Sequence, residues 1–131
     1  MARLFRGKRG YGILYLAFHG GPGHLQLTEA DVELEELAAM VGSGFRGWVV
    51  HFGTCETIAV TAGRLRRFMA STRIAMAVGY SRSVDWIDAA STELLLLDWL
   101  QEYRDLSAMW RTFRRRHRDL VRITGMRAML A

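Results

Sequence analysis

The stretch Trp48–Glu56, which reads Trp-Val-Val-His-Phe-Gly-Thr-Cys-Glu, decides the fold of this chain. The apolar residues of Gly47–Phe52 predict a buried strand, and the glycine at position 53 predicts where that strand ends. The strand carries Cys55, the only cysteine of the protein, to its carboxyl end. A thiol nucleophile would occupy such a position.

A second apolar run, Ile13–Phe18, predicts another strand, and it ends at His19-Gly20-Gly21. Its nearly continuous apolar character indicates a strand that is covered on both faces, as in a parallel sheet. Ligands of open parallel sheets bind beyond the carboxyl ends of the strands. We therefore expect His19, Cys55 and the loop Tyr80–Asp85, which follows a third strand, to meet at one edge of the sheet.

The rest of the chain alternates between short strands and amphipathic helices. This alternation predicts an α/β layered domain with a mostly parallel sheet. The first twelve residues read as a basic lead-in. The other predicted elements are a turn at Gly20–Gly23, a short strand at His24–Leu27, a helix from a Thr28/Asp31 capping box to Val41, a helix at about Thr57–Ala70, a strand at Ile74–Val78, and helices at Ala89–Tyr103 and Leu106–Val121.

Length and composition limit the class of protein. With 131 residues the chain is expected to be one domain, 1–131, with a core over about 11–103 and a C-terminal helical segment over about 104–131. No apolar run approaches the roughly 20 residues that span a bilayer, and the N-terminus does not resemble a signal peptide. We expect a cytoplasmic protein without membrane contact.

The sequence favours neither a metal nor a cofactor. One cysteine and four scattered histidines give no recognisable zinc pattern. The glycine-rich turn at Gly20–Gly23 lacks the Gly-Lys-Ser/Thr of a nucleotide-binding loop. The net charge of +5 is almost wholly due to arginine and gathers at Arg111–Arg118. A basic nucleic-acid-binding module is therefore an alternative, although basic helix faces are commonly just solvated surface.

The chemistry expected at the strand ends is that of a thiol hydrolase. A helix beginning near Thr57 would favour the thiolate of Cys55 through its dipole. His19 would take the thiol proton and protonate a leaving amine, and the backbone N–H groups of Gly20 and Cys55 would hold an oxyanion. A cysteine phosphatase is excluded because Thr61 stands where its arginine is needed. A glutaminase-type nucleophile elbow is weakened because Thr57 replaces the last glycine.

The ordered pattern of strand-His19-Gly20, acidic helix, strand-Gly53-Thr54-Cys55-Glu56 and strand-Gly79-Tyr80 resembles the caspase-like cysteine peptidases of clan CD. The closest likeness is to the short bacterial CHAT and separase-like branch, over about Tyr11–Tyr103. The resemblance implies a three-layer α/β/α fold and a cysteine endopeptidase acting on a protein or peptide. Cys55 would be the nucleophile, His19 the general acid/base, and Gly20 an oxyanion donor.

The resemblance also bears on specificity. In separase-like members an aspartate after the third strand recognises a basic P1 side chain, and Asp85 matches best, with Asp88 as the alternative. This implies cleavage after Arg or Lys. The caspase Gln-Ala-Cys-x-Gly signature is absent, so cleavage after aspartate is not supported.

One departure from the family concerns the start of the chain. The full fold has two strands before the histidine strand, and they are missing here, which would expose a sheet edge. We therefore expect a second copy or a partner subunit to cover that edge. By family analogy, the protein would act in a regulated bacterial defence or stress system. The non-enzymatic alternative is an inactive caspase-like interaction subunit.

Overall fold

The computed structural model describes residues 2–6, 12–27 and 29–131. Its strands and helices alternate along much of the chain, as the sequence predicts. In order they are β1 (Ala2–Arg6), β2 (Gly12–Leu16), β3 (His19–Gly21), β4 (His24–Gln26), β5 (Asp31–Glu33), α1 (Leu34–Val41), β6 (Val49–Phe52), α2 (Ala62–Thr72), β7 (Met76–Tyr80), α3 (Trp86–Glu102), α4 (Leu106–Arg116), α5 (Arg118–Thr124) and β8 (Met126–Leu130).

The main sheet has five strands in the order β1-β2-β6-β7-β8. Its three central strands are parallel, with Leu16 opposite Phe52 and Phe52 opposite Gly79. The two outer strands, β1 and β8, run antiparallel to their neighbours. The predicted α/β class and the parallel centre of the sheet are thus confirmed.

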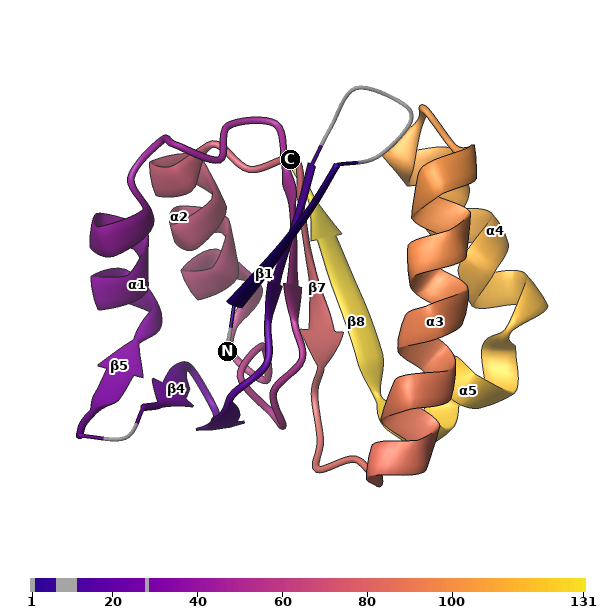
Figure 1. The fold of residues 1–131 in the computed structure, drawn as a ribbon, viewed down its shortest axis with the longest axis horizontal. Coiled ribbons are helices and arrows are strands. Elements are labelled where there is room, and N and C mark those ends of the chain that lie inside the picture. The colour runs from indigo at the N-terminus through magenta and orange to yellow at the C-terminus, as the bar shows by residue number, and fades with distance from the viewer. Residues whose placement is uncertain (1, 7–11, 28) are drawn as a thin grey trace.

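Helices cover both faces of this sheet, so the molecule has three layers (Figure 1). Side chains alternate along the central strands: Leu14, Val50 and Ala77 pack toward α1 and α2, whereas Val49 and Met76 pack toward α3 and α4. The alternation follows from the two-residue period of a strand. Strands buried on both faces need apolar residues at nearly every position, and this explains the continuous apolar runs in the sequence.

Both ends of the chain contribute strands that the sequence did not predict. The supposed basic lead-in contains β1, which pairs with β2 over its whole length. The edge beside β2 is therefore covered by the chain itself, and the argument for a partner subunit at that edge is wrong. The C-terminal segment is not purely helical either, because Met126–Leu130 pairs with β7 as β8.

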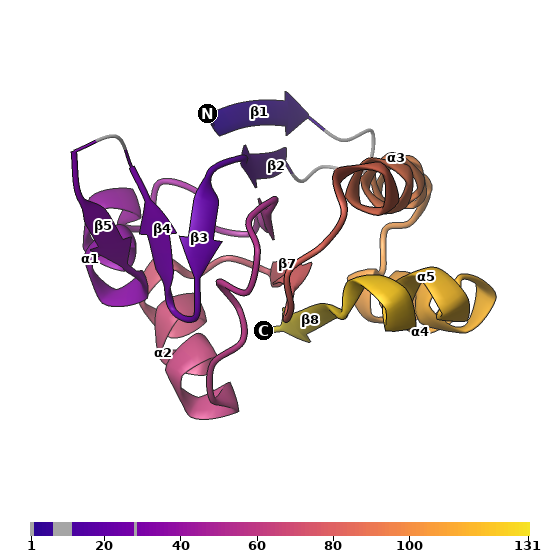
Figure 2. The same cartoon turned by 90° about the horizontal axis from the view of Figure 1, so that it is seen from below.

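A second, smaller sheet lies at the carboxyl end of the parallel strands (Figure 2). It has three antiparallel strands in the order β3-β4-β5. The helix predicted from Thr28 begins only at Leu34, since Asp31–Glu33 pairs with β4 as β5. Thr28 itself lies outside the described residues. The strand predicted to run to Phe18 ends at Leu16 as β2, and His19 opens the separate strand β3, where it pairs with Gln26.

Candidate functional site

The strands that precede His19 and Cys55 are neighbours in the sheet. Beyond their last pair, the N–H of Gly53 donates a hydrogen bond of 2.8 Å to the carbonyl of Leu16. The segments that follow β2 and β6 therefore leave the sheet side by side, at the same edge. The predicted convergence of the two segments is confirmed at the level of the backbone.

The hairpin formed by β3 and β4 then folds onto the turn that carries the cysteine. The N–H of Gly23 donates to the carbonyl of Thr57 at 3.0 Å, and the Thr57 hydroxyl donates to the carbonyl of His24 at 3.1 Å. Two hydrogen bonds in opposite directions fix the hairpin against residues 54–57. His19 is an exposed residue at the start of this hairpin.

Gly20 lies where the hairpin and the turn are closest. A Cβ atom at this position would collide with the Thr57 hydroxyl, and it would stand 2.9 Å from the His24 carbonyl and 3.2 Å from Cβ of Thr54. Only glycine allows so close an approach of two backbones. This contact places the backbone of the residue after His19 against the residue before Cys55, so the two segments lie against each other.

Cys55 is partly exposed, as a nucleophile must be. The hydroxyl of Ser83, from the loop after β7, lies 3.9 Å from its sulfur. The next residue, Glu56, has a φ of 62°, a left-handed conformation that is uncommon for residues other than glycine. Such backbone strain concentrates at functional sites, where the surrounding structure holds it in place.

One predicted source of thiol activation is absent from the structure. The helix expected near Thr57 begins at Ala62, with Thr61 as its N-cap, so residues 54–61 form an irregular segment. The Thr61 hydroxyl accepts a hydrogen bond from the N–H of Arg64 at 3.2 Å. The helix start predicted directly after Cys55 is therefore not present near Thr57.

The irregular segment after Cys55 is anchored to the last strand. Arg127 of β8 donates hydrogen bonds to the carbonyls of Ile58 and Val60, at 3.0 and 2.9 Å. Ser81, just after β7, bonds to the carbonyl of Gly125 through both its N–H and its hydroxyl. Arg127 of β8 and Gly125, directly before β8, therefore hold two of the loops near the cysteine.

The two aspartates expected to recognise a basic side chain follow β7, as predicted. Asp85 is exposed and is the N-cap of α3, since its carboxylate accepts the N–H of Ile87 at 3.2 Å. Asp88 lies in the first turn of the same helix and is partly buried. Asp85 therefore has a structural role as the cap of α3. An exposed carboxylate in water discriminates charge less strongly than a buried one.

A buried polar network, which the sequence does not predict, lies beside the cysteine turn. Glu93 of α3 is its centre. Its carboxylate accepts a hydrogen bond from the Tyr15 hydroxyl at 2.8 Å and one from the Tyr80 hydroxyl at 3.0 Å, and Nε2 of His51 lies 3.1 Å away. The three partners stand on β2, β7 and β6, so one helical carboxylate joins all three parallel strands.

Burial and hydrogen bonding have opposite effects on the pKa of Glu93. Burial alone would raise the pKa of Glu93, but the hydrogen bonds from His51, Tyr15 and Tyr80 outweigh it, and the pKa lies below its usual value. Glu93 is therefore ionised at neutral pH, and Nε2 of His51 donates to it, since a carboxylate only accepts. The pKa of Tyr80 is raised by burial and by the nearby charge of Glu93, so its hydroxyl keeps its proton.

The network reaches the cysteine turn through Tyr15. The Tyr15 ring stacks on His51, with 5.2 Å between ring centroids, and covers Gly53 so closely that a Cβ there would lie 2.7 Å from the ring. His51 itself is buried in the sheet, with 1% of its surface exposed. The sequence feature that could have indicated the network is Glu93, a single glutamate directly before the apolar run Leu94–Leu97.

Two further findings concern metal ions and membrane-spanning helices. Within residues 2–6, 12–27 and 29–131, no three His, Cys, Asp or Glu side chains gather into a group that would hold a metal ion. No helix in this part of the chain has the length and apolarity needed to cross a membrane.

The structure defines an α/β protein in which the segments that carry His19 and Cys55 follow two neighbouring parallel strands at the same edge of the sheet. The sequence matches the model of DUF6642, a family of unknown function, over residues 4–129. The chain belongs to this family. No curated protein matches the chain.

Proposed function

We propose that this protein is a cysteine peptidase with Cys55 as its nucleophile and His19 as its general acid/base. The observation that carries the proposal is the docking of the β3–β4 hairpin on the cysteine turn. The contact of Gly20 with Thr54 and Thr57 brings the imidazole-bearing segment to the thiol-bearing one. The same order of two adjacent strands is what the resemblance to caspase-like peptidases implies.

The reaction follows the usual course of thiol hydrolases. His19 takes the proton of the Cys55 thiol, and the sulfur forms a bond to the carbonyl carbon of the peptide. The N–H groups of Gly20 and Cys55 stabilise the oxyanion. His19 then gives its proton to the departing amine as the C–N bond breaks. Finally, His19 deprotonates a water molecule, which hydrolyses the thioester and restores the thiol.

A preference for Arg or Lys at P1 is the finer part of this proposal. Asp85 and Asp88 lie at the start of α3, just beyond the loop that carries Ser83, and Ser83 touches Cys55. A cationic side chain of a bound peptide would reach these carboxylates. Because Asp85 is exposed, we expect a modest preference for basic residues rather than an absolute one.

Covalent labelling tests the proposal. We expect a peptidyl electrophile with Arg at P1 to label Cys55, as located by mass spectrometry, and labelling to be lost in Cys55→Ala. It should fall at least tenfold in His19→Ala and stay near the wild-type rate in His24→Ala, a histidine of the same hairpin. An Asp-P1 probe should react more slowly.

Failure of this labelling would identify the alternative. If folded protein reacts with a small thiol reagent but with no peptidyl probe, the chain is an interaction subunit and the peptidase proposal is wrong. An equal loss of labelling in His19→Ala and His24→Ala would contradict the assignment of His19 as the base.

A second candidate function rests on the arginines of α4 and α5. Five of them line one hollow of about 610 Å³: Arg111, Arg114, Arg115, Arg118 and Arg122. A polyanion such as a nucleic acid would meet several guanidiniums there. Binding of a DNA duplex that weakens steeply with salt, and weakens further in Arg114→Gln, would favour this function. Salt-independent or undetectable binding would exclude it.

A further inference from the structure

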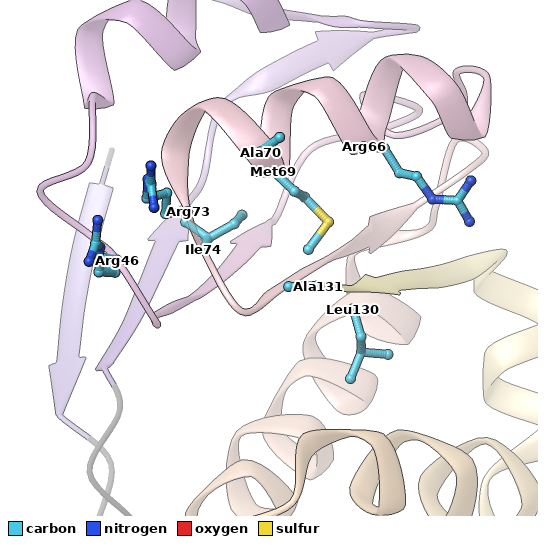
Figure 3. Close-up of a pocket in the computed structure, with 8 residues that line it drawn as sticks. All are labelled: Arg46, Arg66, Met69, Ala70, Arg73, Ile74, Leu130 and Ala131. Carbon is cyan, nitrogen blue, oxygen red and sulfur yellow. The ribbon is translucent and has the colours of Figure 1, made fainter.

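A second hollow lies at the end of the sheet opposite to Cys55. It has a volume of about 590 Å³, and it is lined by three arginines, Arg46, Arg66 and Arg73, and by Met69, Ala70, Ile74, Leu130 and Ala131 (Figure 3). Arg46 shortly precedes β6 and Arg73 shortly precedes β7, so the hollow opens at the amino ends of these strands. We call it the arginine hollow. Its volume lies within the range of small-molecule sites, about 300–1,000 Å³.

The three arginines carry charge that the described part of the chain does not neutralise. None of them forms an ion pair with a carboxylate among residues 2–6, 12–27 and 29–131. Arg64, on the same helix as Arg66, behaves differently, since it bonds to both Glu33 and Glu35 at 2.7 Å. Three guanidiniums around one concave surface repel one another and attract an anion.

The floor of the arginine hollow is apolar. Met69 and Ile74 contribute buried side chains, and Leu130 of β8 is partly buried. Figure 3 shows Met69 pointing from α2 toward the end of β8, with Arg46 and Arg73 to one side of it and Arg66 to the other. A bound molecule would shield the exposed Ala70 and the partly buried Leu130 from water while its charge stays at the rim.

We propose that the arginine hollow binds a small amphipathic organic anion. The anionic head group would lie between the guanidiniums, which offer paired N–H donors suited to carboxylate or phosphate oxygens. The apolar part of the ligand would cover Met69, Ile74 and Leu130. The ligand is not the substrate of the Cys55 chemistry, because the two sites lie at opposite ends of the parallel strands.

Titration with octanoate tests the contributions of the anionic head group and of the alkyl chain of the ligand together. We expect saturable binding by calorimetry, with NMR shift changes confined to the methyl groups of Met69, Ala70, Ile74 and Leu130. Octan-1-ol and octylammonium have the same chain without the negative charge and should bind at least tenfold more weakly. Octyl phosphate should bind as well as octanoate. Equal binding of octan-1-ol would overturn the proposal.

Variants of Ala70 supply a matched pair of controls. Ala70 is an exposed α2 residue that lines the hollow, and both Glu and Gln are good helix formers. A carboxylate in Ala70→Glu would compete with the ligand for the guanidiniums and should weaken octanoate binding about tenfold or more. Ala70→Gln has the same size and should bind within about threefold of wild type if charge decides. Equal affinities of the two variants would contradict the proposal.

Removal of one rim charge gives an independent measurement. Arg66→Gln should weaken octanoate binding about tenfold, since a charge-assisted hydrogen bond is lost. Arg111→Gln removes the same charge from α4 and should leave the affinity unchanged. Cys55→Ala should also bind octanoate normally. An equal loss of octanoate affinity in Arg66→Gln and Arg111→Gln would show that the affinity follows the net charge of the protein. That result would refute a specific binding site in the arginine hollow.

Discussion

Replacement of Glu93 by Gln tests whether the buried network holds the three parallel strands together. The carboxylate accepts from Tyr15 and Tyr80 and meets Nε2 of His51, at 2.8 to 3.1 Å. A hydrogen bond to a charged group contributes about 1.5–3 kcal/mol. The glutamine amide keeps one acceptor oxygen but turns a donor toward a partner that also donates. We expect the free energy of unfolding to fall by about 2–4 kcal/mol.

The pH dependence of this loss is a more specific result. The pKa of Glu93 is lowered in the folded protein, so its contribution to stability is fully present above its unfolded pKa, about 4.3. The contribution is lost as pH falls through the lower, folded pKa. The stability difference between wild type and Glu93→Gln should therefore be constant near neutral pH and shrink at acid pH. Urea unfolding at a series of pH values measures it.

The matched control is Glu102→Gln, the same chemical change at an exposed position of the same helix. It should change the free energy of unfolding by no more than about 0.5 kcal/mol. A loss below about 1 kcal/mol in Glu93→Gln, or a loss that does not vary with pH, would refute the reasoning that an ionised Glu93 joins the strands.

Two further predictions concern the hairpin and a surface ion pair. Gly20→Ala should slow Cys55 labelling at least tenfold and cost about 1–3 kcal/mol of stability, because its Cβ would collide with the 54–57 turn. Gly44→Ala, whose nearest neighbour lies 3.6 Å away, is the control, and unchanged labelling in Gly20→Ala would contradict the docking argument. The hydrogen bonds from Arg64 lower the pKa of Glu35 to about 2, so Arg64→Gln should raise that pKa toward its usual value in an NMR titration. Stability should change by less than about 1 kcal/mol because the pair is exposed, and a Glu35 pKa that stays near 2 in the variant would show that another group is responsible.

The sequence alone determined the centre of the fold and the meeting of two segments. Continuous apolar runs at Ile13–Phe18 and Gly47–Phe52 predicted parallel strands buried on both faces, and the structure contains β2 and β6 as neighbours there. Because the ends of adjacent parallel strands share an edge, the positions of His19 and Cys55 followed from the order of elements. Local patterns carry this information since they depend on burial at each residue.

Three strands that lack a clear local pattern were decided only by the tertiary structure. Ala2–Arg6 and Met126–Leu130 have no pattern that marks them as strands, and they become β1 and β8 because the open edges of the central strands offer them hydrogen-bond partners. Asp31–Glu33 looked like the first turn of a helix and became β5 through pairing with β4. Pairing with a neighbouring strand outweighs weak local propensity in each case.

The polar network around Glu93 also depends on the tertiary structure and not on local sequence patterns. Tyr15, His51, Tyr80 and Glu93 each look like an isolated polar residue in an apolar segment. Their spacing along the chain says nothing about their contact, because three of them stand on different strands and the fourth on a helix. Only the packing of α3 on the sheet brings one carboxylate within hydrogen-bond distance of all three. A buried charge is tolerated where such partners converge, and that convergence is a property of the folded chain alone.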